Sequence, residues 1–146
     1  NHIRAAVADF TFTSKLVDGK FPDYNRVLPK GGNKVILGDC QALKQGFSRA
    51  SILSNEKYRG VRVVLTNGEL RIFANNPEQE EAEEVVAVDY QGEELEMGFN
   101  VSYLIDVLST LRSRQAKITL LDANNSALIE SGDESNAMYV VMPMRL

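Results

Sequence analysis

Apolar and polar residues alternate along much of the chain, which is the pattern of strands that bury one face. The first two strands are predicted near the N-terminus, because Ile3, Ala5 and Val7 recur at every second position and Phe10 and Phe12 do the same. A pair of strands is only marginally stable in water. We therefore expect this segment to complete a larger structure.

An extended link is predicted to follow these strands. Pro22 and Pro29 preclude a continuous helix across it, because proline lacks a backbone N–H and restricts the residue before it. A segment of this kind between two patterned regions is typical of a domain boundary, and we place one here.

The rest of the chain divides into two copies of one pattern: a strand, a helix and three strands. A repeat of about 60 residues predicts a pseudo-symmetric α+β fold. In the first copy we expect a strand at 34–37, a helix at 40–53 and strands at 60–66, 69–75 and 80–90. In the second copy we expect a strand at 94–99, a helix at 101–111 and strands at 116–121, 127–131 and 138–144.

Local signals support these elements. Asp39 and Asn100 are suitable N-caps, and Asn67-Gly68 is a strong hairpin turn. Both helices carry apolar residues at helical spacing, which predicts one buried face on each. These stripes are Leu43, Phe47 and Ala50 in the first helix and Val101, Leu104, Ile105, Leu108 and Leu111 in the second.

The composition is that of an ordinary globular domain, with 44% hydrophobic and 25% charged residues. The net charge of −4 argues against a generally basic nucleic-acid-binding protein, although it permits a local basic face. The single cysteine, Cys40, forms no internal disulfide and is expected to be a small buried thiol in a reducing, cytoplasmic compartment. We expect neither a membrane span nor a signal peptide. Because the chain begins at Asn1, we expect a fragment or a processed product.

Catalytic constellations are not apparent in the sequence. The only histidine is His2, near the chain end, and no carboxylate pair has a catalytic partner beside it. Five glutamates lie within residues 78–84, but at strand spacing their side chains point to both faces, which is poor geometry for one metal ion. We therefore expect a non-enzymatic binding or scaffold domain without a metal or cofactor. The basic residues of the helices and the acidic strand also indicate segregated charge.

Several long segments resemble one family, the β subunit of bacterial DNA polymerase III, or sliding clamp. The resemblance spans the whole chain. It rests on FTSKLVDGKFPDYNRVLP at 12–29, RASILSNEKYRGVR at 49–62, ANNPEQEEAEE at 74–84, GFNVSYLIDVL at 98–108 and YVVMPMRL at 139–146.

The resemblance implies a C-terminal fragment of a three-domain subunit. Residues 1–22 would be the closing strands of the middle domain with its linker, and 23–146 the complete third domain. The implied DNA-clamp fold places two helices on one face of antiparallel sheets. Two full-length subunits would form a ring that slides on duplex DNA as a non-catalytic subunit of the DNA-directed DNA polymerase holoenzyme. The ring would tether polymerase subunits, the clamp loader and repair proteins through short linear peptides.

The resemblance also implies three sets of site residues. The peptide-binding positions are Pro22, Arg26, Val27, Asn100, Tyr103, Ser126, Val140, Val141, Met142, Pro143, Met144 and Arg145. The ring-interface positions are Ile52, Leu53, Glu80, Glu81, Glu83 and Glu84. The DNA-facing positions are Lys44, Arg49, Arg112 and Arg114, which would contact phosphates without reading bases.

Two other interpretations stay open on the residues alone. One is a stand-alone protein-interaction domain without a role at DNA, which the shape of the intact parent protein would distinguish. The other is an enzyme of unknown type on a duplicated α+β fold, against which the missing catalytic constellation argues.

Overall fold

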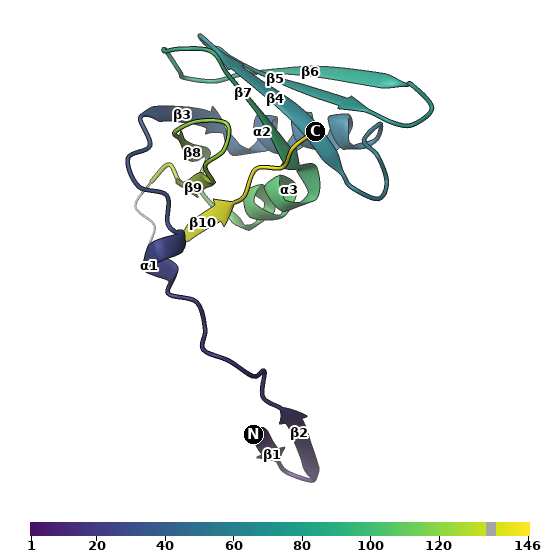
Figure 1. Ribbon diagram of the computed structural model, residues 1–146, viewed down its shortest axis with the longest axis vertical. Coiled ribbons are helices and arrows are strands. Elements are labelled where there is room, and N and C mark those ends of the chain that lie inside the picture. The colour runs from purple at the N-terminus through teal and green to yellow at the C-terminus, as the bar shows by residue number, and fades with distance from the viewer. Residues whose placement is uncertain (134–136) are drawn as a thin grey trace.

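The computed structural model describes residues 1–133 and 137–146 (Figure 1). Its N-terminal part is a hairpin of β1 (His2–Val7) and β2 (Phe10–Lys15), which confirms the two expected strands. The turn between them places Ala8 at a φ of 49°. An extended segment separates the hairpin from the rest of the chain, as Figure 1 shows.

The main body contains two antiparallel sheets of four strands each. The first has the order β10-β9-β8-β3, and the second has the order β6-β5-β4-β7. The first sheet is built from β3 (Lys34–Asp39), β8 (Gln115–Leu120), β9 (Ala127–Ser131) and β10 (Met138–Val141). The second is built from β4 (Gly60–Thr66), β5 (Glu69–Asn75), β6 (Glu81–Ala87) and β7 (Leu95–Asn100).

The two sequence copies exchange their first strands. β3 of the first copy pairs with β8 of the second, where Ile36 lies opposite Ile118. β7 of the second copy pairs with β4 of the first, where Met97 lies opposite Val63. The predicted duplication is confirmed, and the exchange makes both copies parts of one domain.

Two longer helices, α2 (Cys40–Ser51) and α3 (Val101–Thr110), pack against each other and against the sheets (Figure 1). The expected N-caps are confirmed: the Asp39 carboxylate accepts hydrogen bonds from two backbone N–H groups of α2, and the Asn100 side chain accepts one from Ser102. The contacts of α2 include β5 and β6, and those of α3 include β7 and β10.

The hydrophobic core lies where the helix stripes meet the sheets. Leu43, Phe47 and Ala50 of α2 are buried, as expected. In α3 the stripe is confirmed for three residues, whereas Ile105 and Leu111 are only partly buried. Cys40 is a buried free thiol, and burial raises its pKa. In the part of the chain described here, no helix is long and apolar enough to cross a membrane.

Several element boundaries differ from the prediction. The link contains a one-turn helix, α1 (Tyr24–Val27), which Asp23 caps and which fits between the two prolines without crossing either. The last strand of the first copy ends at Ala87, after which Asp89 pairs with Leu37 of the other sheet.

Helix α2 and the last strand also end earlier than expected. Helix α2 is capped at Ile52, after which the chain turns. The last strand ends at Val141, two residues before Pro143, which has no N–H to donate.

Candidate functional site

Strand β10 lies at an open edge of its sheet and is flanked by two apolar hollows. Met138, Tyr139 and Val140 line both hollows, so the strand forms the wall between them. Each hollow has a volume of about 500 Å³. Together they make a shallow, largely apolar surface that β10 divides.

The hollow on one side of β10 is completed by the one-turn helix α1. Tyr24, Val27 and Leu28 supply its other wall. Asp23 accepts a hydrogen bond from the Asn25 N–H at 3.0 Å and so fixes the start of this turn. The exposed side chains of Tyr24 and Val27 are therefore presented beside β10 by a short, capped element rather than by an extended link.

The hollow on the other side is completed by α3. Tyr103, Asp106 and Val107 line it, together with Val141 and Met142 at the end of β10. Tyr103 is 60% exposed and Met142 is 73% exposed, so both present large apolar areas to solvent. Tyr103 and Val107 are four residues apart on one helix and share a face.

The structure thus brings together five of the expected peptide-binding residues. Val27, Tyr103, Val140, Val141 and Met142 line the two hollows beside β10.

The last residues of the chain lie elsewhere, against the second sheet. The Met144 N–H donates to the Gly98 carbonyl oxygen of β7 at 2.9 Å. Met144, Arg145 and Leu146 line a hollow with Tyr58 and other residues of the neighbouring loops.

The remaining expected residues have local roles or lie outside the hollows found in the described residues. The Asn100 amide caps α3 and also donates to the Tyr58 carbonyl oxygen at 3.4 Å. Arg26 is exposed and lies 3.8 Å from the Asp23 carboxylate. Pro22 is exposed, and Ser126 and Pro143 are partly buried.

Sequence reasoning missed some of the lining residues, above all Tyr24, Val107, Met138 and Tyr139. A signal existed for Val107, which follows Tyr103 by one helical turn. A signal also existed for Met138 and Tyr139, since they belong to the same apolar terminal strand as Val140.

A second candidate surface lies at the end of α2. Ile52 is 76% exposed, and it lines a hollow with Leu53, Pro77 and Glu80. Three of the expected ring-interface residues therefore meet at one place. The adjoining strand β6 is one of the two edge strands of the second sheet.

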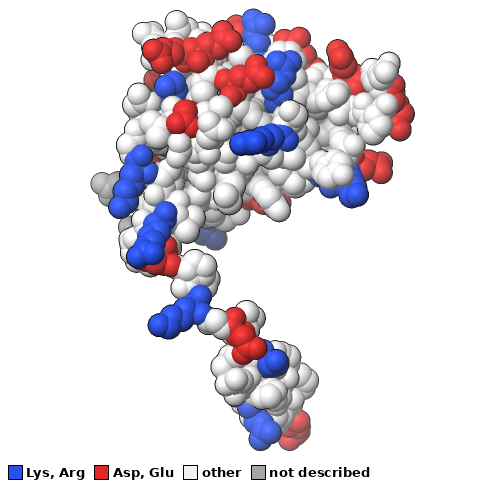
Figure 2. Space-filling model, in the orientation of Figure 1, with Lys and Arg blue, Asp and Glu red and all other residues white. Residues whose placement is uncertain are grey.

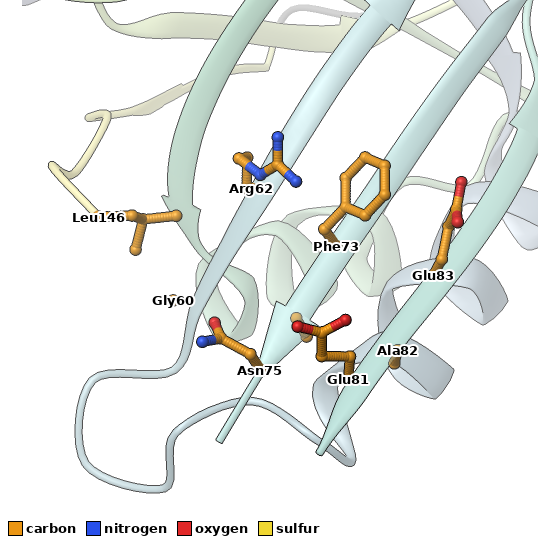
Figure 3. A pocket seen from close by; sticks show the side chains of 9 residues that line it. Gly60, Arg62, Phe73, Asn75, Glu81, Ala82, Glu83 and Leu146 are labelled. Atoms are coloured by element: carbon orange, nitrogen blue, oxygen red, sulfur yellow. The ribbon is translucent and has the colours of Figure 1, made fainter. Parts of the chain in front are cut away.

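Other expected interface residues lie on the two faces of β6. Glu81 and Glu83 line a hollow on the face that also carries Arg62 and Phe73 (Figure 3). The Arg62 guanidinium lies over the Phe73 ring, 4.3 Å from its centroid. Glu84 alternates to the opposite face, next to α2.

Arg49 of α2 and Glu84 of β6 form a two-pronged ion pair. The Arg49 Nε and Nη2 atoms donate to the two carboxylate oxygens of Glu84, each at 2.8 Å. Basic residues lie on the helix and acidic residues on the strand, as the sequence indicated, but the two groups are not kept apart, because a helical arginine directly neutralises a strand glutamate. Figure 2 likewise shows acidic and basic side chains interspersed over the sheet of β4 to β7.

This ion pair makes stability depend on pH. The hydrogen bonds from Arg49 lower the pKa of the Glu84 carboxyl, so its contribution to stability is present above the ordinary glutamate pKa and is lost as the pH falls through the lowered one. We expect Glu84→Gln to lower the melting temperature by about 4 °C at most near pH 7, and not at all in strong acid.

Thermal unfolding followed by circular dichroism between pH 7 and pH 2 measures this difference. Glu81→Gln is the matched control, because Glu81 lies on the same strand without an ion pair among the described residues. If Glu84→Gln lowered the melting temperature by the same amount at every pH down to 2, the stabilising role given to the Arg49–Glu84 ion pair would be wrong.

The other expected DNA-facing residues have different surroundings. Lys44 is partly buried on α2, and Arg112 is exposed beyond the end of α3. Arg114 is exposed and its Nε lies 3.8 Å from the Asp39 carboxylate at the start of α2. Within residues 1–133 and 137–146, no three histidine, cysteine or acidic side chains gather in a way that could hold a metal ion.

Comparison with known proteins gives consistent matches. The family described as DNA polymerase III beta subunit, C-terminal domain, matches residues 25–145. The chain is 64% identical to the beta sliding clamp of Proteus mirabilis and 58% identical to that of Escherichia coli K12, each over 146 residues. Both matches cover the whole of this chain, but the chain spans only 40% of the length of these relatives.

Solved structures agree with these matches. The crystal structure of the DNA polymerase III subunit beta from Pseudomonas aeruginosa superposes with a TM-score of 0.89 at 62% identity, covering 99% of this chain and 40% of that one. A sliding clamp of the same organism bound to griselimycin superposes with a TM-score of 0.88 at 63% identity, covering 99% of this chain and 39% of that one. The DNA-clamp fold expected from the sequence is confirmed.

Proposed function

This chain belongs to the family of DNA polymerase III β subunits, and we propose that it supplies the peptide-capturing part of a processivity clamp. The observation that carries this proposal is the pair of apolar hollows on either side of β10. In the intact protein this surface would hold short linear peptides of polymerase subunits, the clamp loader and repair proteins, and so tether them to DNA.

The chemistry of the surface suits short peptides of differing sequence. Exposed Tyr103 offers a rigid aromatic face, and exposed Met138 and Met142 offer flexible side chains that adapt to different partners. The contacts would be apolar and few, so we expect dissociation constants between about 1 µM and 1 mM, or about −8 to −4 kcal/mol.

We propose the end of α2 and the β6 edge as one side of a ring interface in the full-length homodimer. Exposed Ile52 and partly buried Leu53 would supply apolar contact, worth roughly 1.5–3 kcal/mol for each side chain that becomes fully buried. The neighbouring subunit would supply basic residues opposite Glu80, Glu81 and Glu83. These charge pairs would fix the direction in which the two subunits join. Since Glu84 is already paired with Arg49, we expect it to contribute less to this interface.

The remaining proposals concern DNA and domain organisation. Lys44, Arg112 and Arg114 would face the phosphates of an encircled duplex, with non-specific contacts that permit sliding. Residues 1–22 would belong to the preceding domain and 23–146 to the third domain, which the family match over 25–145 supports. The intact protein would be a non-catalytic, cytoplasmic subunit of the polymerase holoenzyme.

Replacing Tyr103 with alanine tests the proposed function. The probe is a short peptide of the Gln-Leu-hydrophobic type, which the partners of sliding clamps are expected to carry. We expect Tyr103→Ala to weaken binding of this peptide at least about tenfold, because truncation removes a central aromatic contact. The measurement is a peptide titration followed by NMR chemical shifts, which should cluster on Val27, Tyr103 and β10 in the unmodified chain.

Two variants serve as controls. Tyr103→Phe keeps the ring and should bind nearly as well as the unmodified chain. Val85→Ala removes an exposed apolar side chain from β6 and should have no effect. Equal binding by the Tyr103→Ala variant, or shifts gathered on α2, would contradict the proposal.

A further inference from the structure

The C-terminal tail crosses from one sheet to the other. It leaves β10 after Val141 and reaches β7, where the Met144 N–H bonds to the Gly98 carbonyl oxygen. Leu146 then lies beside Gly60 of the neighbouring strand β4, as Figure 3 shows. The tail thus ties the last strand of the first sheet to the edge of the second.

Two glycines make room for this tail. A methyl group on Gly98 would overlap the Met144 carbonyl oxygen and would come within 2.9 Å of Leu146 Cγ. A methyl group on Gly60 would come within 2.5 Å of Leu146 Cδ2. Neither glycine has a positive φ, so the backbone itself does not require them. Their missing side chains serve the close approach of the tail.

The backbone is fixed on both sides of Met142. Val141 before it is buried in β10, and Met144 after it is bonded to β7. Pro143 between them has a restricted φ. The exposed Met142 side chain therefore reaches the hollow beside Tyr103 from a backbone fixed at both ends.

We propose that Gly60 and Gly98 form a seat for the C-terminal tail, and that this seat positions Met142 in the peptide-binding hollow. The coupling to peptide rests on the proposed function. Fixing the Met142 backbone in advance reduces the entropy lost when a peptide binds. Gly98 is therefore a positioning residue that lies on the second sheet, outside the two hollows beside β10.

The test is Gly98→Ala, which adds one methyl group whose three nearest heavy atoms, chain neighbours apart, all belong to the tail. We expect the Met144 amide to lose its protection from hydrogen exchange, and a Gln-Leu-hydrophobic peptide to bind about 3- to 10-fold more weakly. Glu96→Ala is the matched control, because Glu96 lies on the same strand and is bonded to Arg62 instead of the tail.

A second variant keeps the proposal testable if Gly98→Ala perturbs the sheet. Deletion of Leu146 alone removes the side chain that the seat holds and should also weaken peptide binding. Because both changes act by releasing one tail, their effects should not add when combined. Unchanged Met144 protection, or additive effects, would overturn the seat.

The two proposals can fail separately. If the unmodified chain binds the peptide and Gly98→Ala binds it equally well, the positioning role is wrong while the proposed function stands. If the unmodified chain binds no peptide, the proposed function is wrong, and with it the coupling to Met142. The Met144 amide exchange then still shows whether the glycines hold the tail.

Discussion

Replacing Leu43 with alanine should lower the free energy of unfolding by about 2–5 kcal/mol. The Leu43 side chain is 0% exposed, at the centre of the face that α2 buries. It packs so close to β3 that a methyl group added to Gly38 would come within 2.8 Å of Leu43 Cδ1. The surrounding strands are paired and cannot collapse fully into the space, so the cavity persists. Urea unfolding followed by circular dichroism measures the loss.

Ile52→Ala is the matched control for this substitution. Ile52 follows the same helix but is 76% exposed, so truncating it removes little buried surface. We expect a change in unfolding free energy within about 0.5 kcal/mol. If Ile52→Ala destabilised the chain as much as Leu43→Ala, the assignment of core and surface on α2 would be wrong.

Much of the local structure could be predicted because its causes are local. Asp39 and Asn100 cap helices through backbone groups two or three residues away, and the turn at Asn67-Gly68 depends on the positive φ of Gly68. The strand exchange between the two copies has no such signal. The pairing of Ile36 with Ile118 joins residues far apart in the sequence, and alternation alone does not specify a partner.

The candidate site was predictable to a similar degree. Tyr103 and Met142 line one hollow, as the family resemblance implied. Met144 does not line it, because its backbone is drawn to Gly98 on the other sheet. No pattern in the sequence near Met144 predicts this contact. The same limit explains the Arg49 and Glu84 pair, whose members lie 35 residues apart.

Removing Met142–Leu146 should abolish binding of a Gln-Leu-hydrophobic peptide while leaving the domain folded. Buried Val141 stays in β10 after this deletion, so the core remains covered. The deletion removes one hydrogen bond, from Met144 to Gly98, and the contacts of Leu146, which is 68% exposed. The expected cost is about 1–2 kcal/mol of unfolding free energy, well below that of Leu43→Ala.

The loss of binding should be far larger than the loss of stability. Met142 is 73% exposed and lines the hollow that Tyr103 faces, so its removal opens one wall of that hollow to water. The deletion also removes the hydrogen bond from Met144 to Gly98, which holds the chain in place after β10. In an NMR titration the unmodified chain should show shifts at Val27, Tyr103 and β10, next to the hollows, and the trimmed chain should show none. A trimmed chain that binds equally well, or shifts that gather on Lys44 and Arg49, would place the peptide site elsewhere.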